Sequence, residues 1–329
     1  MQYILLFLIL FFIELLYFRI ADRYNIIDKP NIRSSHSNIT LRGGGVLFPI
    51  ALLLAFILGN VSLPFTLAVL LVGTISFIDD IRPLSQLPRF GSHVLASTLV
   101  IYDLNLFVYL FWLLPIVVIF IVGWINAFNF MDGINGMTVM YALTSIISFS
   151  FLPLNQTNLP LLIIMGLSCL AFGFFNIRTK AKTFAGDVGS ISMALFLGYF
   201  MTKTILISGQ FGYILFFSVY GLDVIITLMR RIGKKENIFE AHRTHLYQYL
   251  VNELRFSHLF IAFIYSALQI IINLLVIFLN EKELLTMSVI LGILFVLSLF
   301  NLSLRMIVER KIALKNKNLI NHEYRKNNH

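Results

Sequence analysis

The chain has 329 residues, of which 58% are hydrophobic and only 12% are charged, and its formal net charge is +9. A soluble domain of this length needs more charged surface, so the composition excludes an ordinary globular protein and predicts a helical membrane protein. The single cysteine, Cys169, excludes an intrachain disulfide.

Apolar runs recur along the chain and predict an all-α bundle of about eleven transmembrane helices. The first run has no basic segment before it and no small-residue cleavage site, so we interpret it as a helix and not as a signal peptide. Residues 1–304 then form one membrane domain, and 305–329 form a basic cytoplasmic tail. The expected spans are 2–20, 43–59, 63–78, 90–105, 107–125, 138–153, 160–176, 189–207, 210–229, 257–279 and 284–304.

Lysine and arginine give this bundle a predicted orientation. With the N-terminus outside, only Lys203 and Lys282 of the 25 basic residues fall on the outer side. Basic loops stay in the cytoplasm, so the positive charge reports topology and contact with anionic lipids, and not nucleic-acid binding. The cytoplasmic loops expected to carry function are 21–42, 79–89, 126–137, 177–188 and 230–256.

The first of these loops reads DKPNIRSSHSNITLRGGG and is rich in groups that bind anions. Its basic residues can hold phosphate oxygens. The three glycines weaken the start of the next helix unless something must pack closely there. The candidates are Lys29, Arg33, His36 and Arg42.

Two adjacent carboxylates, Asp79 and Asp80, stand at the inner end of the third expected span. At a low-dielectric boundary they repel each other unless a cation or a proton compensates them. A solvated helix end is the alternative, but acids are disfavoured at a helix C-terminus.

The stretch NAFNFMDGINGM, residues 126–137, places oxygen-bearing side chains at intervals of three. Asn126, Asn129, Asp132 and Asn135 would share one face of a helix or helical turn. Hard cations such as Mg²⁺ take oxygen ligands. A helix cap would explain one or two of these residues, not four in register.

Three further stretches are less specific. Asp187 lies between two glycines at the entry of the eighth expected span, where an N-cap fits equally well. Asp223 lies inside the ninth expected span and is a candidate for function or for a buried hydrogen bond. The last loop holds His242, Arg243 and His245, which have no further ligand nearby for zinc and suit a diphosphate or sugar hydroxyls better.

From Asp28 to about Leu250, the motifs together resemble the polyprenyl-phosphate N-acetylhexosamine-1-phosphate transferases. They occur in that family's order: DKPNIRSSH, GGG, DD, NAFNFMDGING, GDVGS and the histidine loop. The RSSH, RGGG and EAHRTHLYQ variants look like the branch that primes O-antigen and related surface glycans. Asn135 stands where the peptidoglycan branch has an aspartate, which argues against a muramoyl-pentapeptide substrate.

The resemblance implies an enzyme of the bacterial inner membrane with its active site facing the cytoplasm. It would transfer a sugar 1-phosphate from a UDP-N-acetylhexosamine to undecaprenyl phosphate and release UMP. Asp187 and Asn129 would hold Mg²⁺, with Mn²⁺ as an alternative, and Asp79 and Asp80 would receive the lipid phosphate. The remaining candidates would contact nucleotide, metal, sugar or phosphates: Asn126, Asp132, Asn135, His242, Arg243 and His245.

Several alternatives stay open at this stage. We prefer direct attack by the lipid phosphate, and a two-step route through an aspartyl intermediate is the rival. The sugar, the glycan and the oligomeric state are open, with a homodimer as one alternative. An ion-coupled transporter would use the acids as a relay, but we find neither a midplane acid cluster nor an internal repeat.

Overall fold

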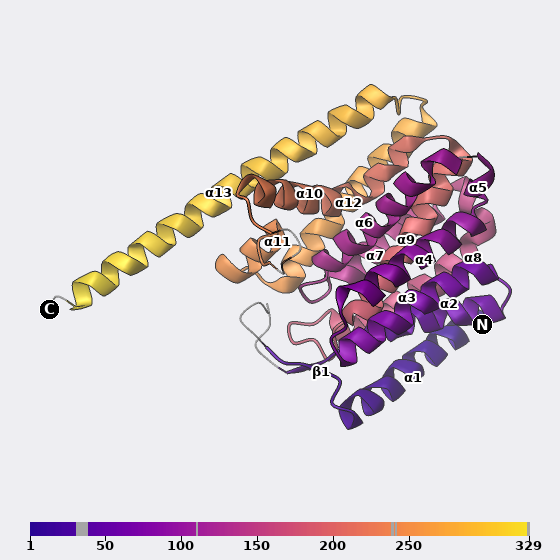
Figure 1. Cartoon of the computed structure of the whole chain (residues 1–329), viewed down its shortest axis with the longest axis horizontal. Coiled ribbons are helices and arrows are strands. Elements are labelled where there is room, and N and C mark those ends of the chain that lie inside the picture. The colour runs from indigo at the N-terminus through magenta and orange to yellow at the C-terminus, as the bar shows by residue number, and fades with distance from the viewer. Residues whose placement is uncertain (31–38, 110, 238–239, 241, 328–329) are drawn as a thin grey trace.

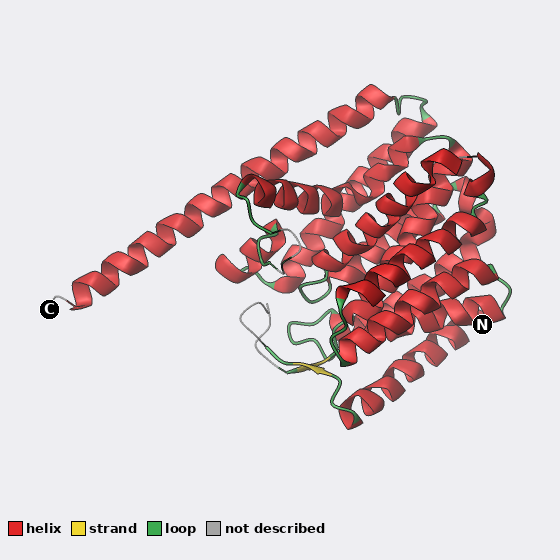
Figure 2. Ribbon diagram, viewed as in Figure 1, coloured by secondary structure: helices red, strands yellow, loops and turns green. Residues whose placement is uncertain are grey.

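Long apolar helices lie side by side in the computed structural model, which describes residues 1–30, 39–109, 111–237, 240 and 242–327 (Figure 1, Figure 2). Arg33 and His36 lie outside these described residues. The first half of the bundle contains α1 (Gln2–Arg23), α2 (Leu47–Ile57), α3 (Leu63–Ile81), α4 (Gln86–Asp103), α5 (Leu106–Tyr109) and α6 (Leu114–Met131).

The second half contains α7 (Met137–Ser150), α8 (Leu159–Asn176), α9 (Gly186–Ser208), α10 (Ser218–Gly233), α11 (Leu246–Gln248), α12 (His258–Glu281) and α13 (Met287–Asn327). Short helical turns join these helices: η1 (Gly44–Val46), η2 (Phe111–Leu113), η3 (Pro153–Asn158), η4 (Phe211–Phe217) and η5 (Tyr249–Glu253). Two short antiparallel strands, β1 (Ile27–Asp28) and β2 (Thr40–Leu41), pair Ile27 with Leu41.

Each of the eleven expected spans overlaps a helix, which confirms a nearly all-α, multi-helix membrane architecture. Within the described residues, eight helices are long and apolar enough to cross a membrane, and the segments 44–57 and 137–150 form shorter apolar helices. The helix α4 is in neither group, and its polar residues include Arg89, His93 and Asp103. Eleven spans and the orientation of the termini therefore stay predictions.

Three helices extend further than expected, and they carry candidate residues that we had placed in loops. The helix α6 continues to Met131 because Ile125, Phe128 and Met131 continue its buried face. Likewise, α3 ends only after the Asp79–Asp80 pair, and α9 begins one residue before Asp187.

The helix α9 lies at the centre of the bundle. Every residue from Val188 to Met201 is buried, as expected for a helix that neighbouring helices surround on all sides. Its neighbours include α3 and α6. The start of α9 is thereby fixed against the ends of α3 and α6.

The last helix, α13, runs without a break from Met287 to Asn327 and so continues past residue 304. The basic cytoplasmic tail beyond that residue stays a prediction. Figure 1 shows the N-terminus at one end of the bundle, while α13 projects past the opposite end, where β1 and α11 also lie.

Candidate active site

The carboxylate of Asp80 joins the end of α3 to the start of α9. Its oxygens accept the backbone N–H groups of Asp187 at 2.9 Å and Val188 at 3.0 Å. These are unpaired donors of the first helical turn, where a negative charge is favourable. Asp80 is thus an N-cap supplied from another helix, and its side chain is fully buried.

Two arginines bridge the carboxylates of this cluster. Arg42 donates from its Nε to Asp80 at 2.7 Å, and its Nη2 lies 3.6 Å from Asp187. Arg89, on α4, places one nitrogen 3.2 Å from Asp79 and the other 3.2 Å from Asp187. The structure therefore brings together the three aspartates that the sequence placed in two separate motifs.

The glycine triplet before α2 packs directly on the start of α9. Gly45 donates its N–H to the carbonyl of Ala185 at 3.0 Å. A Cβ on Gly45 would lie only 2.3 Å from the Cα of Gly189. Gly186 has a left-handed backbone, with φ of 71°, and a Cβ there would lie 2.4 Å from an Asp80 oxygen. Only glycine allows these backbones to approach so closely.

Asn126, Asn129 and Asp132, at or just after the end of α6, make different contacts. Asn129 accepts a hydrogen bond from Ser190 on α9. Asn126 instead donates to the Val122 carbonyl of its own helix at 2.8 Å. Asp132 follows the last residue of α6 and accepts a hydrogen bond from Thr138.

Asp132 lies in a region of excess negative charge. Burial raises its pKa to about 7, and the charges of Asp187 and Asp80 act in the same direction. The hydrogen bond from Thr138 and the charge of Arg42 oppose this shift without cancelling it. Asp132 can therefore gain or lose a proton near neutral pH.

The expected register of four oxygen groups was wrong at Asn135. Because α6 ends at Met131, Asn135 lies in the following turn, and its amide donates to the carbonyls of Arg178 at 2.9 Å and Thr179 at 3.3 Å. This contact fixes the loop between α8 and α9. The side chain thus has a structural contact outside the aspartate cluster.

The histidine loop is anchored by Asp223, which is completely buried. The Asp223 carboxylate accepts hydrogen bonds from the Leu246 N–H at 3.0 Å, from Tyr265 at 2.7 Å and from Arg305 at 3.0 Å. It also lies 3.7 Å from the Nδ1 of His245. Of the two roles considered for Asp223, these contacts favour a buried hydrogen-bonding anchor.

The same loop packs against the turn that carries Asp132. The Tyr247 hydroxyl donates to the Phe130 carbonyl at 2.9 Å, and the Phe130 ring lies about 6 Å from those of His242 and His245. A Cβ on Gly133 would lie 2.2 Å from the Tyr247 oxygen. The histidine loop and the NAFNFMDG stretch therefore form one surface.

Within the surface formed by the histidine loop and the NAFNFMDG stretch, the side chain of His242 is neutral at physiological pH. Burial lowers its pKa to about 4, and the neighbouring His245 and Arg231 act in the same direction. Its Nε2 is buried without a hydrogen-bond partner among the described residues. A neutral imidazole with a spare nitrogen can exchange hydrogen bonds with a ligand but supplies no charge.

Some expected candidates stand apart from these contacts. Lys29 is exposed at the end of β1. Within the part of the chain that the structure describes, no group of three or more His, Cys, Asp or Glu side chains has a geometry that could hold a metal.

Sequence reasoning missed the residues that connect the motifs. Arg89 was counted only as a topology signal, and Arg305 only as part of a tail. Neither belongs to a motif, and each acts through contacts with residues far away in the chain. The spacing of Arg89 on α4 carries no signal of its own, because its partners belong to α3 and α9.

The structure is a multi-helix membrane protein in which arginines bridge a cluster of carboxylates at one end of the bundle. Such a site is typical of the class of membrane proteins that bind an anionic group near the membrane surface. Comparison with known proteins shows similarity to one family. Residues 62–205 match the model of glycosyl transferase family 4.

Curated relatives extend this similarity. The chain is 24% identical over 267 residues to a probable undecaprenyl-phosphate N-acetylglucosaminyl 1-phosphate transferase of Bacillus subtilis, covering 71% of this chain and 72% of the relative. It is 28% identical to an undecaprenyl-phosphate alpha-N-acetylglucosaminyl 1-phosphate transferase of Thermotoga maritima, covering 69% and 74%. A phospho-N-acetylmuramoyl-pentapeptide-transferase of Thermotoga maritima is 32% identical over half of each chain.

Proposed function

We propose that this protein transfers an N-acetylhexosamine 1-phosphate from a UDP-sugar to undecaprenyl phosphate, releases UMP, and thereby starts a surface polysaccharide. The observation that carries the proposal is the bridging of Asp79, Asp80 and Asp187 by Arg42 and Arg89 at one end of the bundle. The relatives named for undecaprenyl phosphate support the choice of acceptor.

The arginines suit the phosphates of the reaction. In the proposed step, an oxygen of the lipid phosphate attacks the sugar-bearing phosphorus, and the bond from that phosphorus to the oxygen of UMP breaks. A guanidinium group binds phosphate oxygens in a fork, so Arg42 and Arg89 can exchange part of their carboxylate contacts for phosphate contacts. The reacting atoms are then held in line, which is most of what phosphoryl transfer requires.

The aspartates take different roles in this scheme. Asp80 is occupied by two backbone amides and Arg42, so we assign it to positioning α9 and not to the base. Asp79 binds Arg89 and the Leu84 amide. Asp132 has a pKa of about 7 because of burial, so it is the carboxylate best suited to move a proton near neutral pH.

A divalent cation fits the donors of this site. Four carboxylates, from Asp79, Asp80, Asp132 and Asp187, face two guanidinium groups, so up to two negative charges stay uncompensated. Mg²⁺ uses one or two protein oxygens together with substrate phosphates and water, so a group of three protein ligands is not required. We propose Asp187 and Asn129 as its ligands; bound there, Mg²⁺ would stabilise the charge that develops on the leaving phosphate.

The test is a mass-spectrometric assay of purified protein with undecaprenyl phosphate and a panel of UDP-N-acetylhexosamines. We expect one lipid-linked sugar product, equimolar UMP, and loss of both in Asp187→Asn. Failure to form a lipid-linked product from any donor would overturn the proposal. Uptake of a solute into vesicles without covalent change would instead support the transporter.

The proposed location is the bacterial inner membrane, with the aspartate cluster on the cytoplasmic side. Nearly all basic residues fall on that side of the predicted topology. Cysteine labelling of Lys203→Cys and Arg178→Cys in intact cells should modify only the first with an impermeant reagent. The reverse pattern would invert the orientation.

A further inference from the structure

Arg305 is a fully charged side chain in the last helix, α13, and it is 1% exposed. It lies 100 residues beyond the end of the region matched by the family model. Burial of an arginine is costly unless its charge and its donors are satisfied. The hydrogen-bond and ion-pair partners of Arg305 therefore indicate its role.

Arg305 and Asp223 together hold the backbone on both sides of His245. Arg305 donates from Nη1 to the Thr244 carbonyl at 2.9 Å, and Asp223 accepts the Leu246 N–H at 3.0 Å. The ion pair between the two side chains, at 3.0 Å, closes this bracket. Thr244 and Leu246 are the residues directly before and after His245.

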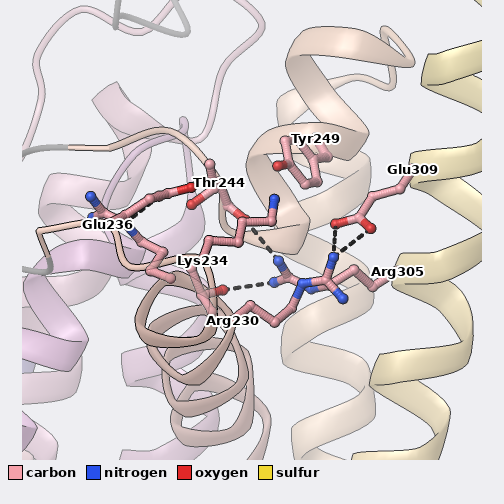
Figure 3. Close-up of a pocket in the computed structure, with 9 residues that line it drawn as sticks. Arg230, Lys234, Glu236, Thr244, Tyr249, Arg305 and Glu309 are labelled. Atoms are coloured by element: carbon pink, nitrogen blue, oxygen red, sulfur yellow. Dashed lines mark hydrogen bonds and ion pairs between the residues drawn. The ribbon is translucent and has the colours of Figure 1, made fainter.

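A second ion pair fixes α13 beside the loop. Arg230 at the end of α10 forms two short contacts with Glu309, one turn beyond Arg305. Figure 3 shows Arg305 and Glu309 reaching from α13 toward α10 and toward the loop segment of Thr244. Both residues line a small pocket beside the loop. The two side chains thus join α13 to α10, and Arg305 also joins it to the histidine loop.

We propose that Arg305 is a positioning residue for the histidine loop, setting the directions of His242 and His245 for the sugar nucleotide. This inference rests on the proposed function for its substrate, but the bracket around His245 rests on the geometry alone. Arg305 does not touch the aspartate cluster in any contact the structure gives, so its effect reaches the reaction through the loop.

Three variants separate positioning from folding. Arg305→Met removes the contact with Thr244 and the ion pair with Asp223, while Arg305→Lys keeps a charge for Asp223 but cannot form the fork to Thr244 as well. The double variant Asp223→Asn with Arg305→Met removes both buried charges together, so no lone carboxylate stays buried. Arg310→Met, at an exposed position on the same helix, is the matched control.

The first measurement is hydrogen exchange of peptides covering residues 242–248 in the purified full-length protein. We expect at least tenfold faster exchange at the Leu246 amide in Arg305→Met, a smaller increase in Arg305→Lys and no change in Arg310→Met. Unchanged exchange in a folded Arg305→Met protein, or equal acceleration in Arg310→Met, would overturn the proposal. This readout needs no substrate.

The second measurement is turnover of the UDP-sugar identified by the donor panel. Loss of hydrogen bonds to a charged group predicts a KM for the sugar nucleotide raised roughly tenfold to hundredfold in Arg305→Met, with a smaller change in kcat. An equal loss of kcat at unchanged KM would contradict positioning of the donor. If the wild-type protein turns over no UDP-sugar, the proposed function fails, and hydrogen exchange still decides the role of Arg305.

Discussion

Gly45 and Gly189 meet backbone to backbone where the glycine triplet crosses the start of α9. A Cβ on Gly45 would come within 2.3 Å of the Gly189 Cα and 2.6 Å of the Ala185 carbonyl oxygen. Both obstacles are backbone atoms, which cannot rotate away. The contact holds the loop of Arg42 against the helix of Asp187.

Gly45→Ala should therefore displace Arg42 from the aspartates. We expect a loss of stability of about 1–3 kcal/mol, as for overpacked cores, and a fall in turnover of roughly 100-fold from misplaced reacting groups. Thermal unfolding and UMP release measure the two effects. Gly123→Ala is the control, because a Cβ there meets no atom within 4 Å. Equal behaviour of the two variants would refute the role of this contact.

The contact between Gly133 and Tyr247 predicts a rescue. Gly133→Ala alone should separate the histidine loop from the turn of Asp132, since the new methyl group would meet the Tyr247 oxygen at 2.2 Å. Removal of that oxygen in Tyr247→Phe leaves the nearest ring atom at 3.1 Å. The double variant should thus be more stable and more active than Gly133→Ala. A purely additive double variant in thermal unfolding would show that the two groups do not interact.

The raised pKa of Asp132 predicts a pH dependence of stability. Between its ordinary value of 3.8 and about 7, the folded protein binds more protons at this group than the unfolded chain does. Stability should therefore fall as the pH rises through this window, and Asp132→Asn should remove that slope. Unfolding in denaturant at several pH values measures it. An unchanged slope in Asp132→Asn would assign the titration to another group.

The same carboxylate offers a test of the cation. Mg²⁺ near Asp132 should favour its ionised form and move the titration to lower pH. The measurement is the stability profile of wild-type protein with and without Mg²⁺, compared with Asp187→Asn. A shift of equal size in that variant would place the cation away from Asp187.

The lowered pKa of His242 predicts the opposite slope. Between about pH 6.5 and 4, the unfolded chain binds more protons at this group, so stability should fall as the pH falls through that window. His242→Gln keeps hydrogen-bonding capacity without titrating and should lose less stability in acid. Unfolding profiles of the two proteins over this range provide the comparison. Parallel profiles would mean that His242 titrates normally.

The sequence predicted the helices well because the composition of each segment is enough to indicate a helix. Runs such as 160–176 and 257–279 are apolar over the length that a bilayer requires, and no distant residue changes that. The ends of helices depend on contacts as well as on composition. The end of α6 was misplaced because Asn126 satisfies its side chain on its own helix, which a count of polar residues cannot reveal.

The motifs did not predict which atoms their residues contact. Asp80 was expected to meet a lipid phosphate, yet its first contacts are backbone amides more than 100 residues away. Asn135 belonged to the same motif as Asn129, but it contacts the loop at Arg178, whereas Asn129 contacts Ser190 in α9. Spacing along the chain fixes a register only while one helix continues, and this helix ends between them.

The partners of Asp80 are synthesised at different times. Its arginine partner precedes it by 38 residues, whereas its amide partners follow it by 107 and 108. At about 5–20 residues per second, ribosomal synthesis separates Asp80 from the start of α9 by roughly 5 to 20 s. During that interval Arg42 is the only one of these partners that has been synthesised. The two residues can therefore enter the membrane as a neutral pair and await the helix that completes the site.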